Sequence, residues 1–287
     1  MKKLSGLMFT IAAASLAHQA SATVLNVCQT GCVFPTIQSA IDNSHDNDVI
    51  QIAAGPYFEN LQVPNRQLTL VGAGQDLTVI DGRQRGTVVT IGTTTQETKA
   101  NTIAIIGVTI THGNAPHGGG ILVNFPALDL QKSIVSSNTA TQSGGGIDLN
   151  SSSIAAKITG TMIVHNRAGT VGAGIAMEQD QSAQISNSSI VRNTATLGGG
   201  GVYFGVNVHS TIAGSTIADN TSQQNGGGVL FDTGDPRPQT LITTSSIVGN
   251  RAAVNGGGLF DAGALPGIDR VVFGNNVPND IFPAPAP

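Results

Sequence analysis

The stretch NTATLGGGGV at residues 193–202 decides the fold, because it recurs along the chain at a nearly constant interval. Gap-free copies are NTATQSGGGI at 138–147, NRAGTVGAGI at 166–175, NTSQQNGGGV at 220–229 and NRAAVNGGGL at 250–259. With a shorter copy included, the aliphatic anchors that close the copies are Ile121, Ile147, Ile175, Val202, Val229 and Leu259. Self-similarity at a fixed period of roughly 20–50 residues is typical of solenoids.

One such repeat, with its short strands and glycine corners, is too small to bury its own apolar face. Stacking solves this, since each coil can place its strands ~4.8 Å above those of the previous coil and form parallel sheets. Side chains alternate along a strand, so each anchor should point inward together with the residue two positions further on. The sequence therefore predicts an all-β, right-handed, single-stranded parallel β-helix.

The repeated Asn and Gly residues have separate structural reasons. Asn138, Asn166, Asn193, Asn220 and Asn250 stand at one recurring corner, where Asn tolerates left-handed backbone and can stack its amide on the next coil. Glycine supplies positive φ at the following corner. A phosphate-binding loop is the functional alternative for the glycine runs, but such loops open a helix, whereas each run here leads into a strand.

Four segments are expected along the chain. Residues 1–22 read as a signal peptide, with a charged start, a short apolar run and cleavage after Ala22, and the protein is therefore expected to be exported to the periplasm, the cell surface or the medium. Residues 23–60 form an N-terminal cap, 61–277 the β-helix and 278–287 a proline-rich tail.

Two features are expected within the cap. Cys28 and Cys32 should form a local disulfide in an oxidising compartment, because neither a metal site nor a lipidation site fits their surroundings. Residues 35–41 carry apolar side chains at helical spacing and predict one short helix over the open end of the solenoid. Such a cap protects the first coil from pairing with other chains.

Composition and charge indicate the type of secondary structure and exclude some classes of binding partner. Gly reaches 37 residues, charged residues make up only 10% and aromatic residues 4% of the chain, and small polar and β-branched residues fill the rest. This mix favours strands and turns over helices. A net charge of -4 gives no basic surface for nucleic acid or for an anionic membrane, and no transmembrane segment is expected in the mature chain. No cofactor is predicted, and the oligomeric state is left open.

Two parts of the chain resemble known families. The segments FPTIQSAID at 34–42, DVIQI at 48–52 and GPYFEN at 55–60 resemble the opening segment of pectin-active and other right-handed β-helix proteins. The glycine coils at about 113–277 are similar to the repeats of polymorphic outer membrane proteins. Together they cover nearly the whole mature chain and imply a pectin-lyase-like solenoid, on which enzymes and non-enzymes both occur.

The enzyme motifs of these families are incomplete here. The Asp-Phe-Ile-Phe-Gly and Gly-Arg-Pro-Trp patterns of pectin methylesterases are missing, as is any Trp. Polygalacturonases follow Asn-Thr with Asp, whereas this chain has Ala140 and Ala195 at that position. A pectate lyase would offer a calcium-binding aspartate cluster and an Arg-Xaa-Pro-Xaa-Xaa-Arg-like base, and Arg237-Pro238 lacks the second Arg of that pattern.

Stacking brings distant polar residues together in two outward columns. His165, Arg192 and Asp219 each precede a ladder Asn, and they form either an acid–base group for a polysaccharide or a solvated column with an Arg192–Asp219 ion pair.

In the second column, Glu178 and Asp232 lie two levels apart, ~9–10 Å, near the upper separation for an inverting glycosidase, with Gly205 as a gap between them for a sugar ring. The insertion that follows adds Asp235 and Arg237 as binding residues. His112 and His117 alone offer too few ligands for a metal site.

Two hypotheses follow. The favoured one is a non-catalytic, secreted surface protein that binds polysaccharide or a cell-surface glycan, for example in adhesion. The alternative is a polysaccharide lyase or glycoside hydrolase that uses Glu178 and Asp232 on pectin-like or other acidic glycans. Scarcity of aromatic rings for sugar stacking and the incomplete catalytic motifs favour the first.

Overall fold

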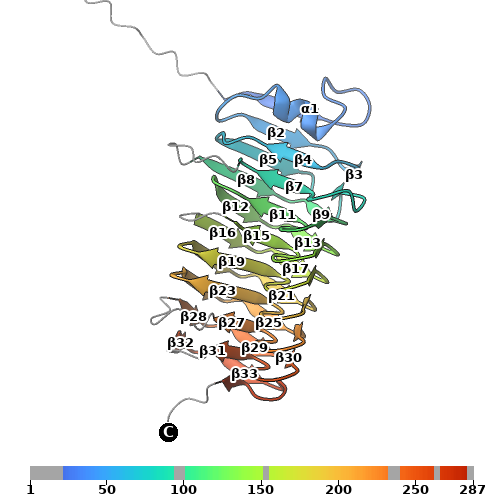
Figure 1. Cartoon of the computed structure of the whole chain (residues 1–287). Helices are drawn as coiled ribbons and strands as arrows, with labels where there is room; N and C mark the ends of the chain where they lie inside the picture. Colours follow the sequence, from blue (N-terminus) through green and yellow to red (C-terminus); the bar gives the residue numbers. More distant parts are fainter. Residues whose placement is uncertain (1–21, 94–100, 151–154, 232–239, 262–265, 283–287) are drawn as a thin grey trace, which may run out of the picture.

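The computed structural model describes residues 22–93, 101–150, 155–231, 240–261 and 266–282, and it forms a stack of β-coils below one short helix (Figure 1). Every strand pair is parallel and joins strands of successive coils. The chain is thus an all-β parallel β-helix, as the repeat predicts. Among the described residues no helix is long and apolar enough to cross a membrane.

Sheets A and B form adjoining walls of the solenoid. Sheet A contains β1 Val24–Val27, β2 Val49–Ile52, β5 Leu68–Gly72, β8 Thr102–Ile106, β12 Ala127–Gln131, β16 Ala155–Thr159, β20 Ser182–Ser186, β24 His209–Ala213, β28 Leu241–Thr243 and β32 Gly267–Asp269. Sheet B contains β3 Gly55–Tyr57, β6 Thr78–Asp81, β9 Thr109–Thr111, β13 Ile134–Ser136, β17 Met162–Val164, β21 Ser189–Val191, β25 Thr216–Ala218, β29 Ser246–Val248 and β33 Val272–Gly274.

The other two sheets flank the glycine corners. Sheet C contains β4 Leu61–Val63, β7 Val89–Ile91, β11 Ile121–Val123, β15 Ile147–Leu149, β19 Ile175–Gln179, β23 Val202–Val206, β27 Val229–Phe231, β31 Leu259–Asp261 and β34 Ile281–Phe282. Sheet D contains β10 Asn114–Ala115, β14 Thr139–Ala140, β18 Arg167–Ala168, β22 Thr194–Ala195, β26 Thr221–Ser222 and β30 Arg251–Ala252.

The aliphatic anchors form one continuous file in the interior. Ile147 pairs with Ile175, Ile175 with Val202, and Val202 with Val229, and all four are fully buried. A second buried file lies two residues further along each strand, where the rings of Phe204 and Phe231 stack with centroids 4.8 Å apart. Burying one such side chain contributes ~1.5–3 kcal/mol, so these files supply much of the stability.

The predicted Asn ladder is present and fully buried. In each step the backbone N–H and Nδ2 of one Asn donate to Oδ1 of the next, as from Asn166 to Asn193 at 2.9 and 3.0 Å. Each Nδ2 also donates to a carbonyl of the preceding coil, such as Ile163 O for Asn193 at 3.0 Å. The ladder continues one coil further than the predicted copies, to Asn276.

One detail of the ladder prediction is wrong. The left-handed backbone belongs to the residue before each ladder Asn, with φ between 54° and 56° at His165, Arg192 and Asp219. The ladder Asn itself has no positive φ, because its side chain must point inward to reach the next coil.

Glycine at the following corner is required by both conformation and space. Gly226, the first of its triplet, has a φ of 63°, and a Cβ there would lie 2.6 Å from Val229 O. At the third position, a Cβ on Gly228 would lie 2.5 Å from the carbonyl oxygen of Gly258 in the next coil. The corner therefore folds tightly over the outer face of sheet C.

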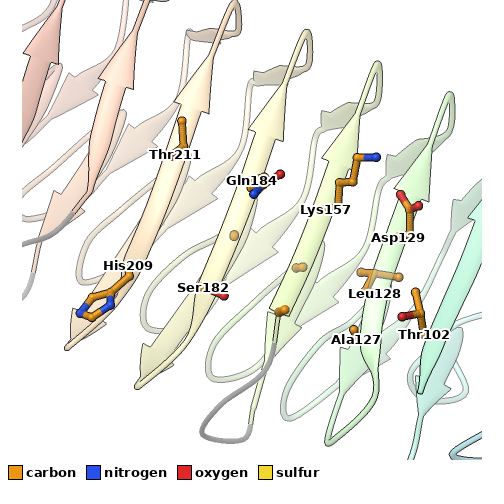
Figure 2. Close-up of a pocket in the computed structure, with 12 residues that line it drawn as sticks. Thr102, Ala127, Leu128, Asp129, Lys157, Ser182, Gln184, His209 and Thr211 are labelled. Carbon is orange, nitrogen blue, oxygen red and sulfur yellow. The ribbon is translucent and has the colours of Figure 1, made fainter. Parts of the chain in front are cut away.

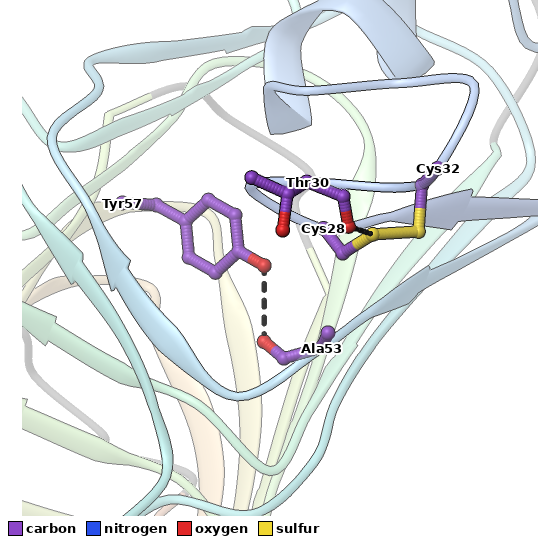
Figure 3. Close-up of a disulfide and its surroundings, with 5 residues drawn as sticks. All are labelled: Cys28, Thr30, Cys32, Ala53 and Tyr57. Carbon is purple, nitrogen blue, oxygen red and sulfur yellow. Dashed lines mark hydrogen bonds between the residues drawn. A yellow bond between two sulfur atoms is a disulfide. The ribbon is translucent and has the colours of Figure 1, made fainter.

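The N-terminal end carries the expected helix and disulfide. Helix α1 spans Ile37–Asp42, begins at the N-cap Thr36 and buries Ile37, Ala40 and Ile41. The Cys28–Cys32 disulfide closes a short loop beside Tyr57, whose hydroxyl donates to Ala53 O at 3.1 Å (Figure 3). Strands β1 and β2 already pair within sheet A, so the segment assigned to the cap contributes strands to the solenoid wall.

Candidate functional site

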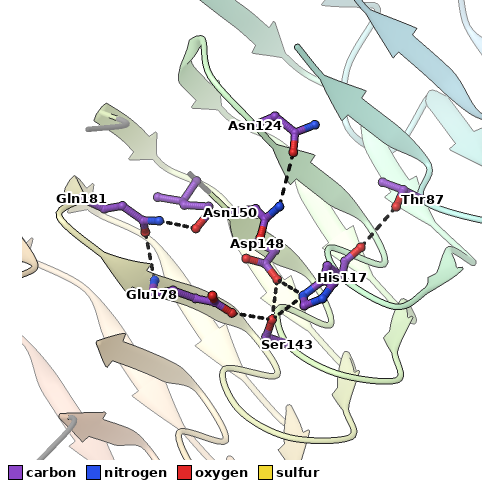
Figure 4. A network of polar contacts seen from close by, with 9 residues as sticks. Thr87, His117, Asn124, Ser143, Asp148, Asn150, Glu178 and Gln181 are labelled. Carbon is purple, nitrogen blue, oxygen red and sulfur yellow. Dashed lines mark hydrogen bonds and ion pairs between the residues drawn. The ribbon is translucent and has the colours of Figure 1, made fainter. Parts of the chain in front are cut away.

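A compact polar cluster joins three consecutive coils on the outer side of sheet C (Figure 4). His117 lies in the corner before β11, Ser143 lies in the equivalent corner before β15, Asp148 lies on β15, and Glu178 lies on β19. In the register of sheet C, Asp148 occupies the position held by Leu122 and Ala176 in the adjacent coils. Stacking alone therefore brings these side chains together.

Asp148 is fully buried although it is on the outer face of its strand. The glycine corner explains this, because Gly144 passes directly over it, and a Cβ on Gly144 would lie 2.4 Å from the Asp148 Cβ. His117 is about one-third exposed, at 32% of its side chain, and Glu178 is exposed. The cluster thus has a buried base and an open outer side.

The other three side chains converge on the hydroxyl of Ser143 (Figure 4). Ser143 Oγ lies 2.8 Å from His117 Nδ1, 2.7 Å from Asp148 Oδ2 and 3.0 Å from Glu178 Oε1. His117 Nδ1 also lies 3.3 Å from Asp148 Oδ2. The corner that carries His117 is held from the preceding coil by Thr87, whose hydroxyl donates to His117 O at 3.3 Å.

The carboxylates of Asp148 and Glu178 favour a positive charge on His117. The hydrogen bond to Asp148 raises the pKa of His117, and the charges of Asp148 and Glu178 add to this effect, whereas burial opposes it. Among the described residues, these two carboxylates are the charged groups that act on His117. The cluster therefore attracts cations.

The arrangement differs from a serine hydrolase triad. In a triad the His bridges the other two residues, using one ring nitrogen for the Ser and the other for the Asp. Here Nδ1 contacts both Ser143 and Asp148, and the Ser143 hydroxyl itself reaches the carboxylate. The cluster therefore lacks the Ser–His–Asp relay of a triad, in which the two ring nitrogens of the His have different partners.

A second feature is an open groove of about 370 Å³ on the outer face of sheet A (Figure 2). It crosses β8, β12, β16, β20 and β24. One row of lining side chains consists of Thr102, Ala127, Ala155, Ser182 and His209. The second row, two residues further along the strands, consists of Asp129, Lys157, Gln184 and Thr211.

The groove has small residues in one row and hydrogen-bonding residues in the other. Lys157 and Gln184 are exposed, and His209 stands at the far end on β24. Asp129 accepts a hydrogen bond from Gln131 at 2.9 Å through Oδ2, while its Oδ1 is buried without a hydrogen-bond partner.

The structure places His165, Arg192 and Asp219 in one outward column, as the sequence predicts. His165, Arg192 and Asp219 follow paired strands of sheet B on successive coils, and Arg192 Nε lies 3.9 Å from Asp219 Oδ2. Both partners are more than half exposed, at 63% and 58%. An exposed pair of this kind contributes only ~0–1 kcal/mol, which agrees with the solvated-column interpretation.

The second predicted column is described only in part. Asp232, Asp235 and Arg237 lie outside the described residues, so the separation between Glu178 and Asp232 stays a prediction. The gap expected at Gly205 is wrong, because Gly205 is buried and a Cβ there would lie 1.7 Å from Glu178 O. The backbone of the neighbouring coil fills that space. Glu178 instead contacts Ser143 on the preceding coil.

In the corner cluster, Ser143 and Asp148 are the functional candidates that sequence reasoning missed, and it missed the groove on sheet A as well. A signal for Asp148 exists, since an acidic residue stands between the inward-facing Ile147 and Leu149, where the neighbouring coils have Leu122 and Ala176. Ser143 gives no comparable signal. Its corner varies freely in sequence from coil to coil.

Comparisons with known proteins give similarity of fold. No family model matches the chain, and no curated protein matches it. Among solved structures, a pectin methylesterase from Aspergillus niger is similar with 16% identity and a TM-score of 0.42, covering 93% of this chain and 92% of that one. A pectin methylesterase from carrot is similar with 12% identity and a TM-score of 0.40, covering 91% and 85%.

Proposed function

We propose that the protein is a secreted, non-catalytic β-helix that binds an extended polysaccharide in the groove on sheet A. The observation that carries this proposal is the two-row groove itself, which repeats hydrogen-bonding side chains at each of several stacked levels. A repeating surface of this kind suits a repeating polymer. The groove is open along its length, which suits a chain that extends beyond it.

The chemistry of the groove favours a glycan over a peptide. Extended peptides usually bind by adding a strand to a sheet edge, but these strands already pair with the coils above and below. Gln184 offers both an acceptor and donors for sugar hydroxyls, and Lys157 offers donors. Lys157 further favours glycans that carry carboxylates, because an ionic hydrogen bond is stronger than a neutral one.

The test measures binding of polygalacturonate, highly methyl-esterified pectin and a neutral glucan by titration calorimetry. We expect the strongest binding for polygalacturonate. Lys157→Ala should weaken it about tenfold, corresponding to ~1.5 kcal/mol for a charged hydrogen bond. Lys132→Ala is the matched control, since Lys132 is exposed in the turn after β12 and does not line the groove.

Two results would contradict the proposal. One is the absence of binding to every glycan of the panel, or equal weakening by Lys157→Ala and Lys132→Ala. The other is turnover, measured as new reducing ends or unsaturated products on the same samples. Turnover that Glu178→Gln or Asp232→Asn abolishes would replace the binding role with the enzymatic one.

A further inference from the structure

We propose that His117, Asp148 and Glu178 bind one divalent transition-metal ion, of the Zn²⁺ class, at the corner shared by three coils. One ligand atom from each of these residues lies within 4.8 Å of the others. The three residues come from three different coils, at β11, β15 and β19, so the site exists only in the stacked protein. The inference is independent of the glycan groove, which lies on sheet A.

Burial of Asp148 is the first reason. Its side chain has no solvent exposure, and its Oδ1 has no hydrogen-bond partner among the described residues. Burying a carboxylate is costly unless the charge is paired and both oxygens are satisfied. Glu178 brings a second negative charge to the same place. A divalent cation balances both carboxylates and takes a ring nitrogen of His117 as its third ligand.

The hydrogens available in the cluster are the second reason. Ser143 has one hydroxyl hydrogen but two carboxylate neighbours, at 2.7 and 3.0 Å. The Ser143 hydroxyl can donate to only one of these carboxylates at a time. The oxygen of the other carboxylate then lies against the hydroxyl oxygen with no hydrogen bond between them. An ion that binds Asp148 and Glu178 removes this conflict, because each carboxylate then has a positive partner.

The ligand set indicates the class of ion. Ca²⁺ and Mg²⁺ prefer shells made of oxygen ligands, whereas one imidazole with two carboxylates suits Zn²⁺ and its first-row neighbours. Zn²⁺ takes four ligands in structural and catalytic sites, so three protein ligands leave one position. The exposed Glu178 side of the cluster makes that position accessible to water or to a small anion.

The experiment uses the full-length, untagged mature protein after chelator treatment. Zn²⁺ binding is measured by titration calorimetry and by metal analysis after gel filtration, and thermal unfolding is followed with and without Zn²⁺, Mg²⁺ and Ca²⁺. We expect one equivalent of Zn²⁺ and a higher Tm with Zn²⁺ only, because a ligand that binds the folded state stabilises it.

The variants distinguish this site from incidental binding. Glu178→Gln changes an exposed side chain and leaves the core intact, and we expect it to weaken Zn²⁺ binding at least tenfold and to abolish the Tm shift. His117→Gln should do the same. His165→Gln and Asp219→Asn are matched controls on the exposed column and should leave both readouts unchanged. Less than half an equivalent of Zn²⁺ in the unaltered protein, or equal affinity in Glu178→Gln, would overturn the proposal.

Discussion

The coils before and after residue 113 achieve the same stacking by different means. In the ladder coils, residues 113–282, one set of contacts repeats from coil to coil through the buried Asn side chains and the glycine corners. In the N-terminal coils, residues 22–112, the strands pair in the same way, but the side-chain hydrogen bonds that fasten the coils differ from one coil to the next. Glu59, for example, accepts from the backbone N–H groups of Ile37 and Gln38, both at 2.9 Å, and fastens α1 to the first coils.

The difference shows that the middle of a solenoid and its end need different kinds of contact. A repeated ladder satisfies buried polar groups along the stack but needs a neighbour on both sides. The end of a stack has a neighbour on one side only, so individual contacts must replace the ladder there. Asp48 illustrates this, because its two carboxylate oxygens accept from the N–H groups of Thr23 and His45, each at 2.7 Å.

The largest expected difference between the two regions concerns Asn residues. Asn193→Ala should lower the free energy of unfolding by about 3–5 kcal/mol, because it leaves the Asn166 N–H, the Ile163 carbonyl and other buried groups unsatisfied. Asn60→Ala in the N-terminal coils loses one bond, to Thr87 O, and should cost about 1 kcal/mol. Denaturant unfolding measures both. Equal losses would show that the ladder adds nothing beyond single hydrogen bonds.

A smaller difference is expected for glycine. Gly226→Ala should destabilise by about 2–3 kcal/mol, because Ala must adopt positive φ and its Cβ would meet Val229 O. Gly31→Ala is the matched control, since Gly31 also has positive φ, 87°, but has nothing within 4 Å of its Cβ position. It should cost ~1 kcal/mol. A loss at Gly226 no greater than at Gly31 would mean that the corners have room for side chains.

The smallest effect belongs to Asp81 in the N-terminal coils. Burial alone would raise the pKa of Asp81, but hydrogen bonds from His112 and from the Arg83 N–H, together with their charges, outweigh burial and lower that pKa below its ordinary value. The stabilisation is therefore present above the unfolded-state pKa near 3.9 and is lost as pH falls through the lower folded-state pKa.

The measurement for Asp81 compares the protein with Asp81→Asn. The stability advantage of Asp81 should lie within the ~0–1 kcal/mol typical of exposed pairs at pH 6 and should shrink by pH 2.5. His112 Nδ1 lies 2.9 Å from the Asp81 carboxylate and is half exposed, which keeps the effect small. An advantage that grows as the solution becomes more acidic would contradict the sign of the shift.

The same contrast explains what could be predicted from the sequence. The ladder, the anchors and the glycine corners were predictable because each is repeated, so the period itself reports which residues stack. Ile37, Ala40 and Ile41 also gave a local helix signal that the structure confirms. Contacts such as that of Glu59 with α1 were not predictable, since they occur once and join residues more than twenty positions apart.

The candidate site shows the limit of column reasoning. The alignment of the repeats correctly predicted that His165, Arg192 and Asp219 lie on successive coils. It did not predict contacts between a corner and a strand. Asp148 and His117 meet because each glycine corner folds back over the strand that follows it on the same coil, and His117 reaches Asp148 from the equivalent corner of the preceding coil. Registers alone do not contain this information.

The central claim is that residues one period apart are direct neighbours on stacked coils, and disulfide mapping tests it most directly. Ser182 and His209 pair in register on adjacent strands at exposed positions, at a separation that suits a disulfide. Under mild oxidation, the variant with Ser182→Cys and His209→Cys should form this cross-link in the monomer, seen by peptide mass spectrometry. The variant with Ser182→Cys and Thr211→Cys, two residues out of register, should form it much more slowly. Equal rates in the two variants, or a cross-link only out of register, would contradict the stacking.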